Sequence, residues 1–291
     1  MKRPVPFFSK NPLDRLDSTR RDACELQKLQ HLPTSLFVLF HEEHVLVCGG
    51  ECFFDEKILH SCEYVKDEVI LLGVEKETHY FCVAVQKYPA ALTAVNLREF
   101  ALQVKEEKLG ILAQSASVLR WHRTHPHCAA CGAPTRLAHA GWRRDCTVCE
   151  KEHFPRTDPV VIMLVTHGEF CLLGRGVAFP EGRYSCLAGY VESGESIEAA
   201  ARRELYEEAG ILGGAVHYVS SQPWPFSSAL MIGVHVEALT KEITIDPHEL
   251  SDARWVGKEE VRALLKGDTS LGITTPSAIA IARNLLEYWA G

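Results

Sequence analysis

Residues 189–211 read GYVESGESIEAAARRELYEEAGI, and this stretch decides the fold. Glu204, Glu207 and Glu208 stand at positions i, i+3 and i+4, so on an α-helix their three carboxylates share one face. Such a face binds metal, because adjacent like charges destabilise a helix whereas Mg²⁺ and Mn²⁺ require hard oxygen ligands. The alternative is a solvated acidic helix face, which is the usual explanation of a charge cluster.

The residues around the three glutamates favour a loop, a helix and a second loop. Alanines 199 to 201 are strong helix formers, and Gly210 stands where a helix typically ends in a glycine. Gly189 and Gly194 mark the loop that precedes the helix. The sequence therefore predicts a metal-binding loop–helix–loop.

This pattern matches the Nudix box at each defining position, so the chain resembles the Nudix hydrolases. The resemblance implies an α/β fold with a Nudix α/β/α sandwich that hydrolyses a nucleoside diphosphate linked to another moiety. Several Mg²⁺ or Mn²⁺ ions in the site would neutralise the phosphates and activate water. The matching positions are Gly189, Glu195, Arg203, Glu204, Leu205, Glu207, Glu208, Gly210 and Ile211.

The resemblance also implies roles for single residues of this stretch. Glu204, Glu207 and Glu208 would bind the divalent ions, and one of them would also activate the water. Arg203 would orient a glutamate through an ion pair, and Glu195 would be a supporting carboxylate.

A second motif, SQPWPF at residues 221–226, narrows the substrate. Its two prolines keep the backbone extended and outside any helix, which presents an indole and an amide at defined positions. The alternative is a proline-rich loop that anchors a core tryptophan. The motif resembles the SQPWPFPxS signature of the NADH pyrophosphatase branch, although Ser227 and Ala229 replace the usual proline and the final serine. The resemblance implies that Gln222, Trp224 and Phe226 bind substrate.

Four cysteines, Cys128, Cys131, Cys146 and Cys149, form two C-x₂-C pairs. This spacing predicts a zinc ribbon with one structural Zn²⁺ per chain. A disulfide framework is disfavoured because the sequence shows no secretory segment. A ribbon can instead grip nucleic acid, and the arginines at positions 143 and 144 offer a small positive patch, but a net charge of −7 opposes that role.

Further positions gain a role only from the resemblance. Tyr190 and Phe154 occupy places where relatives sandwich the nicotinamide, the second ring coming from a neighbouring subunit, which implies a homodimer. Glu249 would complete the metal shell, and Ala188 would offer its backbone carbonyl to the metal. Ala282 would contact the substrate through its backbone.

Length and composition fit an ordinary soluble protein with two domains and a small staple. The 291 residues exceed one typical domain, and the resemblance implies an N-terminal Nudix-like α+β domain at 1–122, a zinc ribbon at 123–157 and the catalytic Nudix domain at 158–291. No apolar run approaches the roughly 20 residues that cross a bilayer, and no targeting segment is recognised. We therefore expect a cytoplasmic protein that does not contact membranes.

Hydrophobic patterning predicts the elements of each part. Apolar residues over 97–104 and 111–121, with Gly110 between them, indicate a helix or helix pair, and the Nudix loop follows a strand over 184–188. A hairpin is expected over 160–173 and a closing helix over 277–289. The remaining strands are expected at 36–40, 44–47, 69–74, 80–85, 231–238 and 243–245.

These observations predict an enzyme that cleaves the diphosphate of NADH or NAD⁺ into nicotinamide mononucleotide and AMP. Removal of an NAD cap from RNA 5′ ends is an alternative that cuts the same bond. A nucleotide-binding regulator with a silent site is an alternative of another class, but a pure binder has no need of the whole carboxylate cluster.

Overall fold

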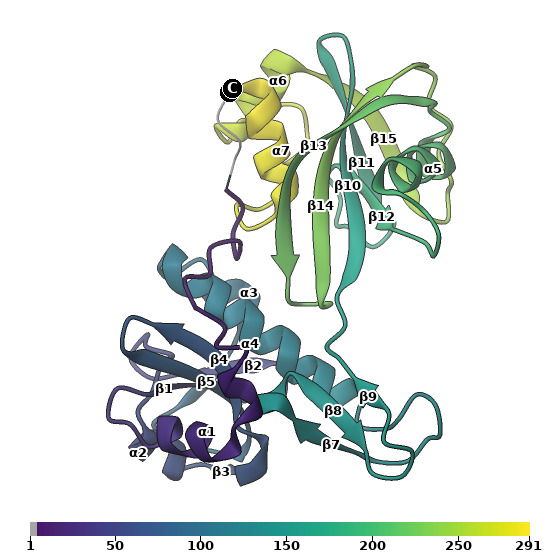
Figure 1. Cartoon of the computed structure of the whole chain (residues 1–291). Helices are drawn as coiled ribbons and strands as arrows, with labels where there is room; N and C mark the ends of the chain where they lie inside the picture. Colours follow the sequence, from purple (N-terminus) through teal and green to yellow (C-terminus); the bar gives the residue numbers. More distant parts are fainter. Residues whose placement is uncertain (1–4) are drawn as a thin grey trace. The chain divides into compact units, whose positions relative to one another are not determined.

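The structure, a computed structural model, describes residues 5–291 and divides into two compact units (Figure 1). Among the described residues, unit 1 contains 5–9, 158–224 and 229–291, and unit 2 contains 10–157 and 225–228. The short segments 5–9 and 225–228 thus each belong with a part of the chain that is distant in sequence. The domain boundaries at 122 and 157 stay predictions. No helix of the described residues is long and apolar enough to span a membrane.

Unit 2 is built on a six-stranded sheet of order β3-β5-β1-β2-β6, in which β4 also pairs with β5. The central strands β1 and β5 are parallel, and α4 packs against one face of the sheet. The four strands predicted in this region are confirmed. The elements are β1 (Leu36–His41), β2 (His44–Val47), β3 (Glu63–Tyr64), β4 (Ile70–Glu75), β5 (Thr78–Lys87), β6 (Thr93–Asn96), α1 (Ala23–Gln30), α2 (Glu56–His60), α3 (Leu97–Phe100) and α4 (Glu106–Thr124).

The predicted helix pair is confirmed as α3 and α4, and Gly110, which stands between the two apolar runs, lies inside α4. A Cβ atom at this position would stand 1.9 Å from the carbonyl oxygen of Lys10. The glycine therefore allows the N-terminal segment to cross the helix closely, and it does not end the helix.

The last part of unit 2 is a three-stranded sheet of order β7-β8-β9, with β7 at Thr135–Ala138, β8 at Arg143–Cys146 and β9 at Glu152–His153. Both strand pairs are antiparallel. Cys128 and Cys131 precede β7, whereas Cys146 ends β8 and Cys149 lies in the turn between β8 and β9, which matches the predicted ribbon.

Unit 1 repeats the plan of unit 2, with a six-stranded sheet of order β13-β14-β10-β11-β15 and β12 paired to β10. Its central strands β10 and β14 are parallel, and the predicted hairpin joins β10 to β11. The elements are β10 (Asp158–His167), β11 (Phe170–Gly176), β12 (Leu187–Tyr190), β13 (Gly213–Trp224), β14 (Ala229–Ala238), β15 (Leu250–Gly257), α5 (Ile197–Ala209), α6 (Lys258–Leu265) and α7 (Ile281–Ala290).

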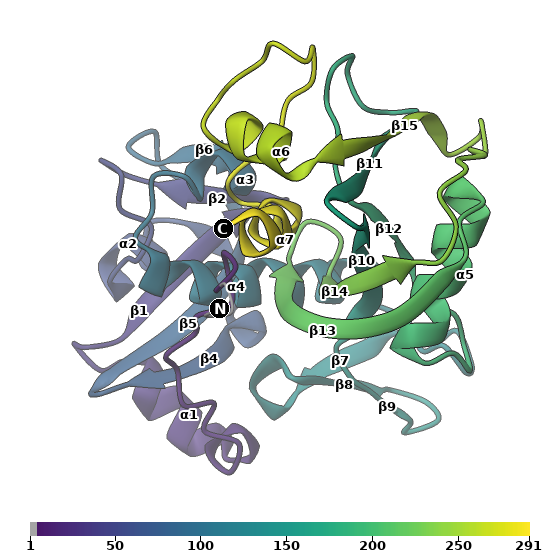
Figure 2. The ribbon, with the colours of Figure 1, turned by 90° about the horizontal axis from the view of Figure 1, so that it is seen from above.

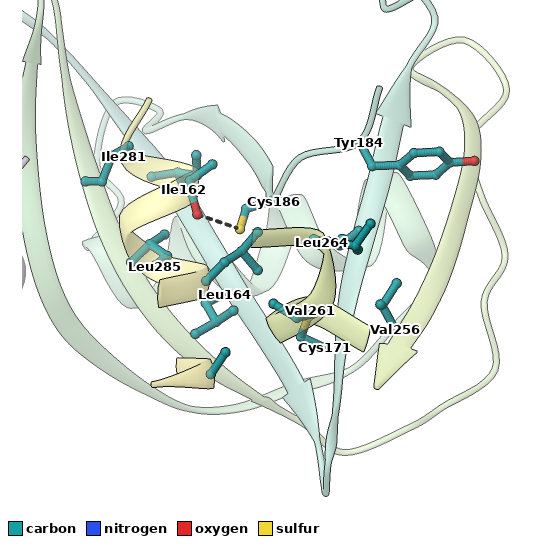
Figure 3. Close-up of a cluster of buried hydrophobic side chains, with 14 of the residues drawn as sticks. Ile162, Leu164, Cys171, Tyr184, Cys186, Val256, Val261, Leu264, Ile281 and Leu285 are labelled. Carbon is teal, nitrogen blue, oxygen red and sulfur yellow. Dashed lines mark hydrogen bonds between the residues drawn. The ribbon is translucent and has the colours of Figure 1, made fainter. Parts of the chain in front are cut away.

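Helices cover both faces of the sheet of unit 1, with α5 on one side and α6 and α7 on the other (Figure 2). Alternate residues of the apolar strand β10 point to opposite faces, so Val161 and Met163 pack toward α5 whereas Ile162 and Leu164 pack toward α7 (Figure 3). Each fully buried aliphatic side chain contributes about 1.5–3 kcal/mol of transfer free energy. This two-sided core fixes α5 against the sheet.

Three elements of unit 1 were not predicted, and one prediction is wrong. The strands β13 and β15 and the helix α6 carry mixed polar sequences without a clean hydrophobic period. Ile243 and Ile245 form no strand, although both pack against the core on the α5 side. The two isoleucines alternate with a polar residue because they are two partly buried side chains of a loop.

Candidate active site

The helix α5 begins and ends where its sequence predicts. The hydroxyl of Ser196 accepts a hydrogen bond from the backbone N–H of Ala199 at 3.2 Å, which caps the first turn. Gly210 ends the helix in the left-handed conformation with φ of 70°. These two ends fix the register of the acidic residues between them.

Three carboxylates meet beside this helix, those of Glu204, Glu208 and Glu249, with one oxygen of each within 4.8 Å of the others. Glu204 and Glu208 are four residues apart on α5, and Glu249 stands directly before β15. The i, i+4 pair was predicted from spacing, and Glu249 from the family resemblance alone. Hydrogen bonds from the N–H of Asp246 to the carbonyl of Glu208 and from the N–H of Glu249 to the carbonyl of Asp246 hold this loop against the helix.

The electrostatics of this trio fit a divalent cation. Glu208 is only 5% exposed, and its Oε1 is buried without a hydrogen-bond partner among the described residues. Burial raises the pKa of Glu208 to about 8, and the nearby charges of Glu204 and Glu249 add to the shift. Burial also raises the pKa of Glu204. Three hard oxygen donors whose one positively charged partner within the described part of the chain is Arg203, on Glu204, are a donor set suited to Mg²⁺ or Mn²⁺.

Arg203 binds the other carboxylates of the motif. Its Nε and Nη2 donate to the two oxygens of Glu195 at 2.7 and 2.9 Å, which lowers the pKa of Glu195 to about 2. Its Nη1 donates to Glu204 and Glu207, each at 2.8 Å, and its Nη2 donates to the carbonyl of Tyr190 at 2.9 Å. Arg203 thus connects the loop to the helix and orients Glu204.

Glu207 lies apart from the trio, with an exposed side chain paired to Arg203. Ala188 is exposed on β12, and its backbone also interacts with Glu208. Their roles as metal ligands stay predictions.

The four ribbon cysteines converge as predicted, with all four Sγ atoms within 4.8 Å of one another. Cys128 and Cys149 are 3.6 Å apart, and Cys131 and Cys146 are 3.5 Å apart. Tetrahedral zinc with Zn–S bonds of about 2.3 Å places its sulfurs about 3.8 Å from each other. All four thiols are free, so the cluster fits Zn²⁺ and forms no disulfide.

The positive patch considered for the ribbon is not formed. Arg143 pairs with Asp145 and Glu152. Arg144 is 6% exposed and donates to Thr135 and to the ring of His122. Both arginines therefore stabilise the ribbon and its attachment to α4.

Gln222 is fully buried, and its amide is occupied by backbone groups. Its Nε2 donates to the carbonyls of Phe7 and Ile279 at 3.0 and 2.8 Å, and its Oε1 accepts from the N–H of Ile281 at 2.9 Å. This geometry gives Gln222 a structural role, joining the N-terminal segment to the start of α7. The predicted contact with substrate is not supported by this geometry.

The other predicted substrate residues differ in exposure. Tyr190 and Phe154 are 56% and 61% exposed, so neither ring is part of a core. Trp224 is half-buried at the end of β13. Phe226 packs in unit 2, with the guanidinium of Arg98 4.7 Å from its ring centre. Ala282 is buried in the first turn of α7. Their contacts with substrate stay predictions.

Comparisons with known proteins agree with this geometry. Residues 34–121 match the NADH pyrophosphatase-like rudimentary NUDIX domain, residues 123–154 the NADH pyrophosphatase zinc ribbon domain, and residues 155–275 the NUDIX domain.

Two relatives and one solved structure illustrate the similarity. The chain is 35% identical to the human NAD-capped RNA hydrolase NUDT12, over 97% of this chain and 73% of that protein. It is also 35% identical to the NAD-capped RNA hydrolase NudC of Mycobacterium bovis, over 99% and 96% of the two chains. A crystal structure of a Nudix hydrolase from Nitrosomonas europaea is similar over 56% of this chain and 89% of that chain, with 18% identity and a TM-score of 0.46. The chain therefore belongs to the Nudix hydrolases of the NADH pyrophosphatase type, with a rudimentary Nudix domain and a zinc ribbon before the catalytic domain.

Proposed function

We propose that this enzyme hydrolyses the diphosphate of NADH or NAD⁺ and releases nicotinamide mononucleotide and AMP. The observation that carries the proposal is the carboxylate trio, in which Glu204 and the buried Glu208 of a Nudix loop–helix–loop meet the exposed Glu249. A regulator with a silent site has no use for a buried carboxylate of raised pKa, because such a group costs stability unless a cation or proton neutralises it.

The trio, together with Glu207 and the carbonyl of Ala188, would hold Mg²⁺ or Mn²⁺. Divalent cations bound there supply positive charge to the diphosphate and acidify water. Oxygen of water attacks one phosphorus, the bridging P–O bond breaks, and each product keeps one phosphate. Carboxylates of the trio accept the proton of the water, while Arg203 holds Glu204 in place.

We further propose that Cys128, Cys131, Cys146 and Cys149 bind one structural Zn²⁺ per chain. Four thiolates close its coordination, so no position remains for substrate. The ribbon then stabilises unit 2 and takes no part in the chemistry.

The exposed rings of Tyr190 and Phe154 would stack on the nicotinamide, Phe154 being supplied by the second subunit of a homodimer. Trp224 would serve the adenosine half, and the backbone of Ala282 would contact the substrate. A stacking contact contributes on the order of 1–3 kcal/mol, which corresponds to about ten-fold in kcat/KM.

A comparison of NADH with ADP-ribose tests this substrate assignment. Tyr190→Ala should lower kcat/KM about ten-fold for NADH and less for ADP-ribose, which has no nicotinamide. Trp224→Ala should affect both substrates alike. Equal losses on both substrates for Tyr190→Ala would mean that Tyr190 only packs the loop.

NAD-capped RNA is a second substrate of the same site. The printed names of the two relatives above, NUDT12 and NudC, favour it. The enzyme would cut the same bond in this substrate. The one further requirement is an open path for the RNA beyond the 3′ oxygen of the adenosine.

A further inference from the structure

A polar cleft of about 370 Å³ lies in unit 1 where β11 and β15 pair. No aliphatic side chain larger than glycine lines it, and its one ring is that of Tyr184. This lining does not suit a base or a nicotinamide, which bind on apolar faces. The lining residues are Arg175, Glu181, Gly182, Tyr184, Ser251, Asp252, Arg254 and Gly272.

Arg175 in this cleft has no partner of opposite charge. Asp252 stands directly opposite in the strand register, but its carboxylate accepts from the hydroxyl of Tyr184 and from Arg254, whose Nη2 is 2.6 Å away. Among residues 5–291, Arg175 forms no salt bridge, and its Nε is buried without a hydrogen-bond partner. A half-buried guanidinium that forms no ion pair and has an unpaired N–H attracts an anion.

Backbone contacts join the strand that carries Arg175 to the segment that carries Glu249. Arg175 is still paired with Asp252, and the ladder between β11 and β15 becomes irregular only after it, between Arg175 and Gly176. The hydroxyl of Ser251 donates to the carbonyl of Arg175 at 3.0 Å, and the N–H of Val177 donates to the carbonyl of Glu249 at 3.0 Å. Ser251 is two residues beyond Glu249, which along a strand is about 7 Å.

We propose that Arg175 binds the phosphodiester that follows the adenosine in an NAD-capped RNA. This inference rests on the proposed function, and it adds a specificity-determining residue to it. One nucleoside separates that phosphodiester from the scissile diphosphate, which matches the short chain distance between Arg175 and the carboxylate trio. Free NAD⁺ has no phosphate at this place, so the contact favours the RNA.

The cleft also contains one group that opposes an anion. Glu181 is exposed at its edge and forms no salt bridge among the described residues, whereas the charge of Asp252 is balanced by Arg254. Removing the charge of Glu181 should therefore have the opposite effect from removing that of Arg175.

The test compares kcat/KM for NAD⁺ and for a short NAD-capped oligoribonucleotide. Arg175→Gln should lower the value for RNA about ten-fold more than the value for NAD⁺, Arg175→Lys should recover part of it, and Glu181→Gln should raise it two- to three-fold. Arg175→Gln should also reduce the slope of log kcat/KM against log salt on RNA by about 0.7, the loss of one phosphate contact on a single strand.

Equal losses of Arg175→Gln on both substrates with an unchanged salt slope would overturn the proposal and leave the proposed function standing. If the wild type cleaves NAD⁺ but not capped RNA, the proposal for Arg175 is also overturned and the proposed function also stands. If the wild type cleaves neither compound, the proposed function fails, and equilibrium binding of the two compounds to wild type and Arg175→Gln still decides the role of Arg175. If Arg175→Gln does not fold, Glu181→Gln takes its place: an unchanged kcat/KM for RNA in that variant would overturn the proposal.

Discussion

Gly189 on β12 lies directly against the carboxylate of Glu204 on α5: a Cβ atom at Gly189 would stand 1.9 Å from Cδ of Glu204. This glycine has no left-handed backbone conformation, so it is required for the close approach and not for a turn. The first glycine of the motif thus makes room for the first glutamate of the carboxylate trio.

Gly189→Ala should therefore displace Glu204 and lower kcat at least 10²-fold, while the protein still folds. Gly257→Ala is the matched control, because the nearest atoms to its added methyl group are side-chain atoms of Glu260 at 3.1 Å and of Phe170 at 3.8 Å. Steady-state kinetics and thermal unfolding of both variants check this. Normal turnover of Gly189→Ala would show that catalysis does not depend on the observed position of the Glu204 carboxylate.

Glu208→Gln keeps the shape of the side chain but removes one unit of ligand charge, so turnover should fall by orders of magnitude at saturating metal. Glu207→Gln should behave similarly if Glu207 turns from Arg203 to the metal. The exposed Glu242→Gln serves as the control. Near-normal kcat in both of the first two variants would contradict the assigned chemistry.

The carboxylate trio illustrates what the sequence could and could not predict. Glu204 and Glu208 follow from their helical spacing, because the capping residue and the final glycine fix one register. Glu249 has no such local signal, and only the resemblance indicated it. The partners of Gln222 lie near residues 7 and 280, so no local pattern could show that its amide is occupied.

The fold was predictable where the hydrophobic period was clean, as in β1, β10 and α5. It was not predictable where distant segments meet. No local pattern indicates that Gly110 is a crossing point inside α4, because the crossing segment at Lys10 is about a hundred residues away in sequence. The strand β13 has too many polar residues, with two glycines and a proline, for its period to be recognised.

Purified protein should contain about one tightly held Zn per chain, and Cys146→Ser should remove it and lower the stability of unit 2. The exposed Cys48→Ser, outside the cluster, should change neither quantity. Elemental analysis with thermal unfolding measures both effects. Zinc-free wild type with a disulfide among the four cysteines would refute the ribbon.

His122 should make the stability of unit 2 depend on pH. Burial lowers its pKa to about 4, whereas the unfolded value is about 6.5, so the unfolded chain binds the proton more readily. Stability contributed by the neutral ring is complete above pH 6.5 and is lost as pH falls toward 4, on the order of 2–3 kcal/mol.

His122→Gln is the matched variant for this effect, because its amide can still accept from Arg144 and donate to Gly141. Urea unfolding at pH 7 and pH 5 should show a smaller loss for the variant than for wild type. Equal losses would assign the acid sensitivity to other groups, such as the thiolates.

The central claim is that clustered glutamates direct hydrolysis to the diphosphate. The direct measurement is chromatographic identification of the products formed from NAD⁺ with Mg²⁺ or Mn²⁺. We predict nicotinamide mononucleotide and AMP in equal amounts, and neither product with the Glu208→Gln variant. Formation of nicotinamide and ADP-ribose, or the same products at the same rate from Glu208→Gln, would contradict the claim.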